Sequence, residues 1–167
     1  ISANGTWIWA TAAGGGNDDY GQGISALADG SALVTGHFHS STMTFSSDLT
    51  LAHSVNGGSW DIFVAKISAN GTWIWATAAG GSADDEAFGL SALADGSSLV
   101  TGYFASSTIT FDSGLTLANS VNGGGSNDIF VAKISANGSW IWATAAGGSS
   151  QDNAIGISAL ADGSALV

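Results

Sequence analysis

A near-identical internal repeat is the sequence feature that most limits what this chain can fold into. Residues 1–66 recur as residues 67–133 with one inserted glycine near Gly125, and 52 of the first 66 positions are identical. Residues 134–167 begin a third copy and stop within it. Because self-similarity at a fixed period is typical of repeat folds, the sequence predicts repeat 1, repeat 2 and a partial repeat 3 within one continuous architecture.

Each copy consists of short apolar segments separated by turn residues. Residues 61–68 (DIFVAKIS) and 72–79 (TWIWATAA) flank Asn70-Gly71, which predicts a hairpin with a type I′ turn. A second hairpin is predicted to turn at Asp29-Gly30, Asp95-Gly96 and Asp162-Gly163, and a weaker one to join 42–45 to 49–53. Sustained helical periodicity is absent from the sequence, so helix is expected to be nearly absent.

The order of the segments within one period predicts the sheet. The segments GISALA, SALVTG, DIFVAK and TWIWAT follow one another through tight turns, as in an up-and-down antiparallel sheet of four strands. They are apolar or small nearly throughout, which is typical of a sheet covered on both faces. We therefore predict an all-β chain of antiparallel four-stranded blade-like sheets, one per repeat of about 67 residues, in a β-propeller-like arrangement or an open array rather than a closed ring.

Residues 61–104 contain an ordered series of motifs. They are a DIFVAK strand, an Asn-Gly turn, a strand with tryptophan, the loop GGSADD and a strand with Val-Thr-Gly, and the pattern restarts at 128–133. This series resembles the bacterial SBBP-type β-propeller repeat family. The resemblance implies a blade-like sheet in a secreted or surface protein. One stretch departs from the family pattern, because residues 40–52 (SSTMTFSSDLTLA) replace an Asp-Phe-Pro segment and contain no proline.

Composition excludes several classes of partner. The chain has 2 basic and 13 acidic residues and a net charge of −11, and its only cations besides the N-terminus are Lys66 and Lys133. It cannot form the basic surface that binds nucleic acid or an anionic membrane. The absence of cysteine excludes disulfides and thiolate metal sites. The sequence has no apolar run long enough for a membrane-spanning helix, so no membrane insertion is expected.

Catalysis has no support in the motifs. There is no cysteine, no G-x-S-x-G elbow and no repeated Ser/His/Asp set, and the glycine-rich stretches lack the lysine of a phosphate-binding loop. We therefore expect no enzyme activity, no catalytic residues, no cofactor and no metal site.

Three acidic loops are the first candidates for a binding role. They contain Asp18-Asp19, Asp84-Asp85-Glu86 and Gln151-Asp152. Paired carboxylates among small polar residues suit Ca²⁺, although no D-x-D-x-D-G spacing is present. Loops capped by Asp side chains are the interpretation that we favour, and calcium binding is left open.

Histidines and tryptophans are the second group of candidates. His37 and His39 lie two apart and so share a strand face, where they suit either a transition metal or, as we favour, a solvated surface. The tryptophans recur as the pairs Trp7/Trp9, Trp73/Trp75 and Trp140/Trp142. Each pair is predicted to lie on one strand face and to be buried between sheets, with a stacking surface for sugars as the alternative. Trp60 occurs in repeat 1 only and is a candidate for an exposed contact. His53 also occurs in repeat 1 only and is replaced by Asn119 in repeat 2.

Glycosylation is also left open by the sequence. Asn4, Asn70 and Asn137 each begin a formal N-glycosylation sequon, but the Asn-Gly turn explains these residues without a sugar. The clusters SSTMTFSS and SSTITFDS could carry O-linked glycans or simply hydrate a loop.

These observations together predict a non-enzymatic, extracellular or cell-surface bacterial repeat protein with a structural or adhesive role. We expect it to form part of a tandem array or filament and to associate with identical repeats or subunits, because its first and last sheets are predicted to lack strands. A carbohydrate-binding β-propeller lectin with surface glycans as partners is the alternative.

Overall fold

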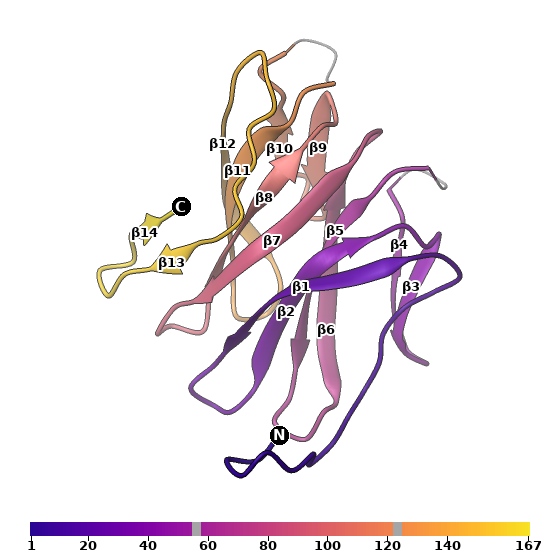
Figure 1. Ribbon diagram of the computed structural model, residues 1–167, viewed down its shortest axis with the longest axis vertical. Coiled ribbons are helices and arrows are strands. Elements are labelled where there is room, and N and C mark those ends of the chain that lie inside the picture. The colour runs from indigo at the N-terminus through magenta and orange to yellow at the C-terminus, as the bar shows by residue number, and fades with distance from the viewer. Residues whose placement is uncertain (55–57, 122–124) are drawn as a thin grey trace.

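The computed structural model describes residues 1–54, 58–121 and 125–167 (Figure 1). The first sheet contains, in order, β1 (Asp19–Ala26), β2 (Ala32–Phe38), β5 (Asp61–Ile67), β6 (Trp73–Gly80), β9 (Thr108–Phe111) and β10 (Thr116–Ala118). The second sheet contains β12 (Trp140–Ala146), β11 (Asp128–Ile134), β8 (Ser98–Phe104) and β7 (Asp85–Ala92). Two small sheets pair β3 (Thr42–Ser46) with β4 (Leu49–Ala52) and β13 (Ser158–Ala159) with β14 (Ala165–Leu166).

The predicted fold class is confirmed. The described ranges form strands and no helix, and every strand pair is antiparallel. The predicted order of four strands recurs as β1-β2-β5-β6 in the first sheet and as β7-β8-β11-β12 in the second. Within the part of the chain that the structure describes, no helix has the length and apolar character needed to cross a membrane.

The hairpin turns place only their glycines in the left-handed region. Gly71 has a φ of 85°, and no described residue other than glycine has a positive φ. The Gly71 N–H donates to the Ser68 carbonyl (3.0 Å), and the Ser68 N–H donates to the Thr72 carbonyl (2.9 Å). This is a three-residue loop, with a type I turn followed by a glycine bulge, so the predicted type I′ turn is wrong. Asn70 stays at negative φ, where its Oδ1 accepts a hydrogen bond from the Thr72 N–H (3.3 Å).

A pair of glycine substitutions separates turn strain from a packing contact. Gly5 and Gly71 have φ of 83° and 85°, but a Cβ on Gly71 would lie 2.8 Å from the Trp9 ring, whereas one on Gly5 would meet nothing within 4 Å. Gly5→Ala should cost about 1 kcal/mol from positive φ alone, and Gly71→Ala about 2 kcal/mol because the ring must also move. Urea unfolding of both variants checks this, and equal losses would show that the ring contact contributes nothing.

A β-bulge separates the two tryptophans in the pairs Trp73/Trp75 and Trp140/Trp142. Trp75 pairs with Lys66 and Trp73 with Ile67, so Ile74 is the extra residue between them. Trp73 consequently packs with the cluster that contains Phe45, and Trp75 with the cluster on the other face of the sheet. The prediction that each pair lies on one face is therefore wrong, because one inserted residue reverses the alternation of side chains.

Burial of the tryptophans differs along the chain. Trp140 is buried, Trp73 and Trp75 are half-buried, and Trp7 is 77% exposed. All three pairs were predicted to be buried between sheets. Of these four side chains, only Trp140 is fully buried as predicted. Each ring is buried only to the extent that a hairpin or a turn of another segment lies against it.

The weaker hairpin of each repeat reaches back to the preceding sheet. β9 pairs with the end of β6 through Ala79–Phe111 and Gly80–Thr110. The β9–β10 hairpin therefore extends the first sheet, although the hairpin that precedes it in sequence, β7–β8, belongs to the second sheet. A single bridge between Gly14 and Thr44 joins β3 to the segment that corresponds to β6. The predicted hairpin at 42–53 is confirmed, but the sequence did not predict that it would link neighbouring repeats.

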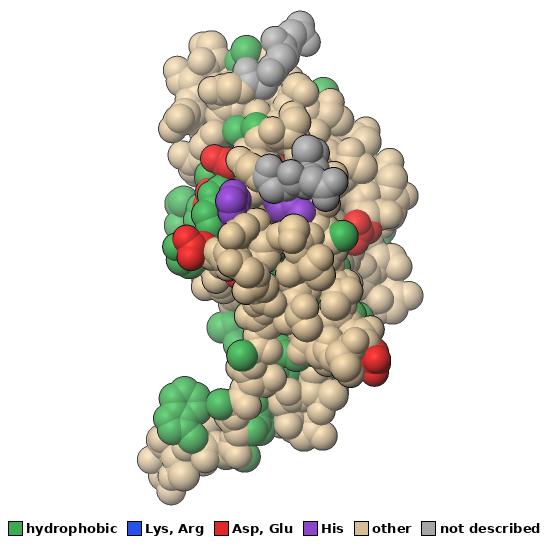
Figure 2. Space-filling view, turned by 90° about the vertical axis from the view of Figure 1, so that its right-hand side faces the viewer, with side chains coloured by type: hydrophobic (Ala, Val, Ile, Leu, Met, Phe, Trp, Pro, Cys, Tyr) green, Lys and Arg blue, Asp and Glu red, His purple; other side chains and the backbone are tan. Residues whose placement is uncertain are grey.

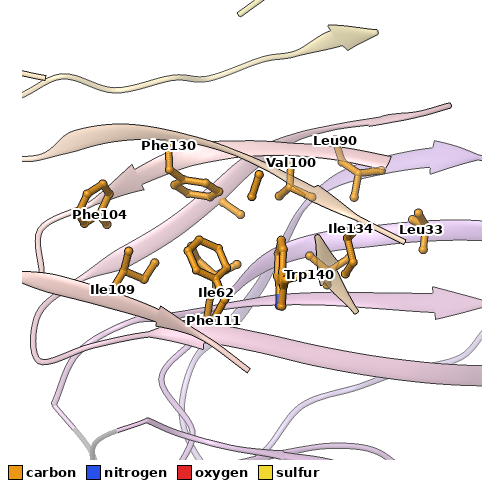
Figure 3. Close-up of a cluster of buried hydrophobic side chains, with 14 residues drawn as sticks. Leu33, Ile62, Leu90, Val100, Phe104, Ile109, Phe111, Phe130, Ile134 and Trp140 are labelled. Carbon is orange, nitrogen blue, oxygen red and sulfur yellow. The ribbon is translucent and has the colours of Figure 1, made fainter. Parts of the chain in front are cut away.

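The main core lies between the two large sheets (Figure 3). The first sheet contributes Ile62 and Phe111, and the second contributes Phe130 and Trp140, with Phe111 and Trp140 ring centroids 4.9 Å apart. Burying such large apolar side chains is the main stabilising contribution in a fold of this size. A smaller core, which contains Phe45, packs against the opposite face of the first sheet.

Candidate functional site

The second tryptophan of each pair forms a contact between successive repeats. The indole N–H of Trp9 donates to the Ala69 carbonyl (2.9 Å), and that of Trp75 donates to the Ala136 carbonyl (3.1 Å). The Trp75 ring lies so close to the next turn that a Cβ on Gly138 would come within 2.9 Å of it. The Asn-Gly turns therefore do two things: they reverse the chain and they accept a tryptophan ring from the preceding repeat.

Hydrogen bonds between the first strands of successive repeats form a second recurring contact. The Ala92 N–H of β7 donates to Ser25 Oγ of β1 (3.1 Å), and the Ala159 N–H of β13 donates to Ser91 Oγ of β7 (3.0 Å). A Cβ on Gly89 would lie 3.0 Å from Gly156 Cα, so the glycine allows these strands to approach closely. The sheets are thus held at one spacing by the same groups each time.

At each outer face, one half of the contact between a tryptophan ring and a glycine turn is present without the other half. No atom lies within 4 Å of a Cβ built on Gly5, although its φ matches that of Gly71. Trp142 corresponds to Trp75, but none of the described turn glycines lies against its ring. Ile24 of β1 is 71% exposed, whereas its counterpart Leu90 is buried in the main core between the two large sheets. One outer face therefore presents a turn without a ring, and the other presents a ring without a turn.

The acidic loops are tied by hydrogen bonds. Asp19 Oδ2 accepts from the Ser40 hydroxyl (2.8 Å), and Asp85 Oδ2 accepts from the Ser106 hydroxyl (2.8 Å). Asp152 accepts a backbone N–H of its own loop at 2.8 Å. The favoured interpretation as Asp-capped loops agrees with this geometry. No group of three or more His, Asp or Glu side chains in the described residues is placed to hold a metal ion.

Burial makes Asp85 electrostatically unusual. Burial raises the pKa of its carboxyl to about 7, against the hydrogen bonds from Ser106, which lower the pKa. The charge of Asp61 raises it further. The Asp85 carboxyl therefore titrates near neutral pH.

The Ser/Thr clusters belong to these loops and hairpins. Ser40 and Ser106 are buried anchors for Asp19 and Asp85, and Phe45 of the first cluster is buried in the smaller core. The remaining threonines of β3 and β9 point to solvent. The three sequon residues Asn4, Asn70 and Asn137 are exposed in turns, and their glycosylation stays a prediction to be tested.

The non-repeated aromatic and histidine residues gather at the junction between repeats 1 and 2. We name the following set the junction cluster: Tyr20, His37, His39, Trp60, Glu86, Phe88 and Tyr103. Ring centroids of Trp60 lie 4.9 Å from His37, 5.2 Å from His39 and 5.4 Å from Tyr20. His37 is 5% exposed, so its interpretation as solvated surface is wrong, because Trp60 and Phe88 cover it.

Polar contacts complete the junction cluster. The Tyr103 hydroxyl donates to Glu86 Oε1 (2.6 Å), and His37 Nδ1 lies 3.4 Å from Glu86 Oε2. Burial lowers the pKa of His37, and burial together with Glu86 raises the pKa of Tyr103. Figure 2 shows histidine side chains on this side of the molecule with acidic and hydrophobic side chains beside them.

His53 lies outside the junction cluster and contacts Ser59 and Asp61 of its own repeat. It is buried, with Nε2 2.7 Å from the Ser59 carbonyl and Nδ1 3.5 Å from Asp61 Oδ2. Its counterpart Asn119 donates to the Ser126 carbonyl (2.9 Å), so both residues fasten the same loop.

Comparison with known proteins gives no assignment. No family model matches the chain. No curated protein matches it either.

Proposed function

We propose that this chain is a non-enzymatic structural repeat protein of the bacterial cell surface or extracellular space, which associates with identical repeats or subunits into a tandem array or filament and serves in adhesion. The observation that carries the proposal is the contact between a tryptophan ring and a glycine turn, which is made at Trp9–Gly71 and Trp75–Gly138. The two halves of this contact are open at Gly5 and Trp142.

Three properties support this role. A heterologous contact, in which one face binds a different face, extends indefinitely unless it closes into a ring. Apolar side chains exposed at the outer faces, Ile24 and Trp142 among them, favour association, because a neighbouring sheet would remove them from water. The −11 net charge and the resemblance to β-propeller repeats favour a secreted, soluble surface protein.

The alternative of a lectin with a sugar site at every junction has less support. The Trp9 and Trp75 rings lie against turns of the next repeat, so those faces are occupied. A glycan array distinguishes the two roles, because recurring sugar sites would give saturable binding to one sugar class.

Association of the purified chain tests the proposal. Sedimentation and negative-stain images of the 167-residue chain should show concentration-dependent assemblies larger than 16.5 kDa. Trp142→Ala should shift the equilibrium toward monomer by about tenfold, because it removes an aromatic contact of roughly 1–2 kcal/mol. Ile141→Ala is the matched control, since this neighbour is 52% exposed and lies at the bulge. A monodisperse, stably folded monomer at all concentrations would contradict the proposal.

A further inference from the structure

Several positions at which the copies differ meet at one place in the fold. Repeats 1 and 2 differ at 14 of 66 aligned positions, and five of these positions supply the whole junction cluster. Tyr20 corresponds to Glu86, and His37 to Tyr103. Both members of each pair meet at one junction, because the sheets bring β1, β2, β7 and β8 together there.

The junction between repeats 2 and 3 shows which residues occupy the corresponding positions when the aromatic and histidine side chains are missing. Asn127 and Asn153 stand where the junction cluster has Trp60 and Glu86, and the Asn127 amide donates to Asn153 Oδ1 (2.8 Å). This polar pair joins the two repeats without any ring. The aromatic side chains are thus not needed to hold successive repeats together.

Trp60 is fixed in position by its main chain. Its N–H donates to Asp84 Oδ1 (3.2 Å), and its carbonyl accepts from the Asp85 N–H (2.8 Å). Its ring is half-buried, while the Tyr20 ring beside it is 47% exposed. A ligand at the surface therefore meets a Trp60 ring that packs against the rings of Tyr20 and His37.

The carboxylates of this region have no cationic side chain to neutralise them. Asp84 is exposed and Glu86 is half-buried, and both interact electrostatically with His37. The chain contains two lysines and arginine is absent from it; Lys66 contacts Asp29 at 3.4 Å, and Lys133 contacts Asp95 at 3.7 Å. Both lysines thus lie at the turn end of the sheets, opposite the junction cluster.

Three buried side-chain polar atoms among the described residues lack a hydrogen bond, and one of them, His37 Nδ1, lies in the junction cluster; the others are Ser98 Oγ and Trp140 Nε1. His37 Nδ1 is buried and lacks a hydrogen bond, since its 3.4 Å approach to Glu86 Oε2 does not have hydrogen-bond geometry. Buried polar atoms without partners are uncommon in structural cores and are frequent where a ligand or a solvent molecule completes the site.

We propose that the junction cluster binds the alkylammonium group of a small organic cation. A diffuse positive charge is attracted to the faces of tryptophan and tyrosine rings, and quaternary ammonium groups are the ligands best suited to them. Asp84 and Glu86 add a negative potential beside Trp60 and Tyr20. A metal ion fits less well, since no three ligand side chains converge among the described residues.

The test compares choline with its neutral isostere, 3,3-dimethylbutan-1-ol, by ligand-observed NMR titration of the 167-residue chain. Choline should bind saturably in the millimolar range and roughly fivefold or more tightly than the isostere, because only choline has the charge. Trp60→Asn, the residue found in repeat 2, should weaken choline binding about tenfold. Glu86→Gln should weaken choline but not the isostere, since it keeps the acceptor for Tyr103 and removes the charge.

Matched variants keep the proposal falsifiable. Trp7→Asn removes an exposed tryptophan outside the junction cluster and should leave choline binding unchanged. If Trp60→Asn does not fold, His39→Ala, also a repeat 2 residue, replaces it in the test. Equal binding of choline and the isostere, unchanged binding in the Trp60 variant, or saturable binding of a neutral sugar or Ca²⁺ without choline would overturn the proposal. Because the site lies within one chain, its result is independent of self-association.

Discussion

Replacing Trp75 with alanine is expected to lower the free energy of unfolding by about 2–4 kcal/mol, whereas Trp142→Ala should cost less than about 1 kcal/mol. The two residues occupy the same position of the repeat, on β6 and β12. Trp75 donates its indole N–H to the Ala136 carbonyl and packs against Gly138, whereas no described turn glycine lies against the Trp142 ring. The difference between the variants therefore measures one contact between repeats.

Urea unfolding followed by far-ultraviolet circular dichroism gives both values from the same chain. The experiment is best done at a concentration where the chain is monomeric, because association would stabilise the Trp142 face. Equal destabilisation by the two substitutions would mean that the turn contact is incidental, and the proposed basis of self-association would lose its main support.

The positions of most strands and turns could be predicted from the sequence, because these depend on neighbouring residues, although the predicted turn type was wrong. DIFVAK and TWIWAT are apolar segments with β-branched and aromatic residues, and Gly71 and Gly96 mark the positions that need positive φ. The β-bulge at Ile74 was missed, since nothing in the composition of this segment shows which strand carries an extra residue. That single residue decided on which face Trp73 and Trp75 lie.

The junction cluster could not be predicted from local pattern, since its members are brought together by pairing between distant strands. Tyr20 and His37 are opposite each other on β1 and β2, and Trp60 and Glu86 arrive from the next loop and the next sheet. A signal was nevertheless present in the sequence. The positions at which nearly identical copies exchange one reactive or aromatic residue for another were the positions to examine together.

Asp85 should make the stability of the protein depend on pH between about 4 and about 7. Burial raises the pKa of this carboxyl to about 7 in the folded state, above its ordinary value of 3.8. The folded protein therefore holds the proton more tightly than the unfolded chain does. The resulting stabilisation is complete below the unfolded pKa and is lost as the pH rises through the folded pKa.

Asp85→Asn removes this pH-dependent loss of stability. The difference in free energy of unfolding between the variant and the wild type should therefore be about 2–4 kcal/mol more favourable to the variant at pH 8 than at pH 4. The substitution suits the site sterically: the new amide can donate to Ser106 Oγ, while the Ser106 hydroxyl keeps its contact with the Ala83 carbonyl at 3.2 Å. Asp95→Asn is the control, because hydrogen bonds from Ser97 lower the pKa of that exposed carboxyl, and its titration window lies below pH 4. Unfolding curves at about pH 4, 6 and 8 for the three proteins separate these cases. A constant difference between Asp85→Asn and wild type across that range would show that Asp85 does not titrate near neutral pH, and that the buried carboxylate is stabilised in its charged form by its hydrogen bonds.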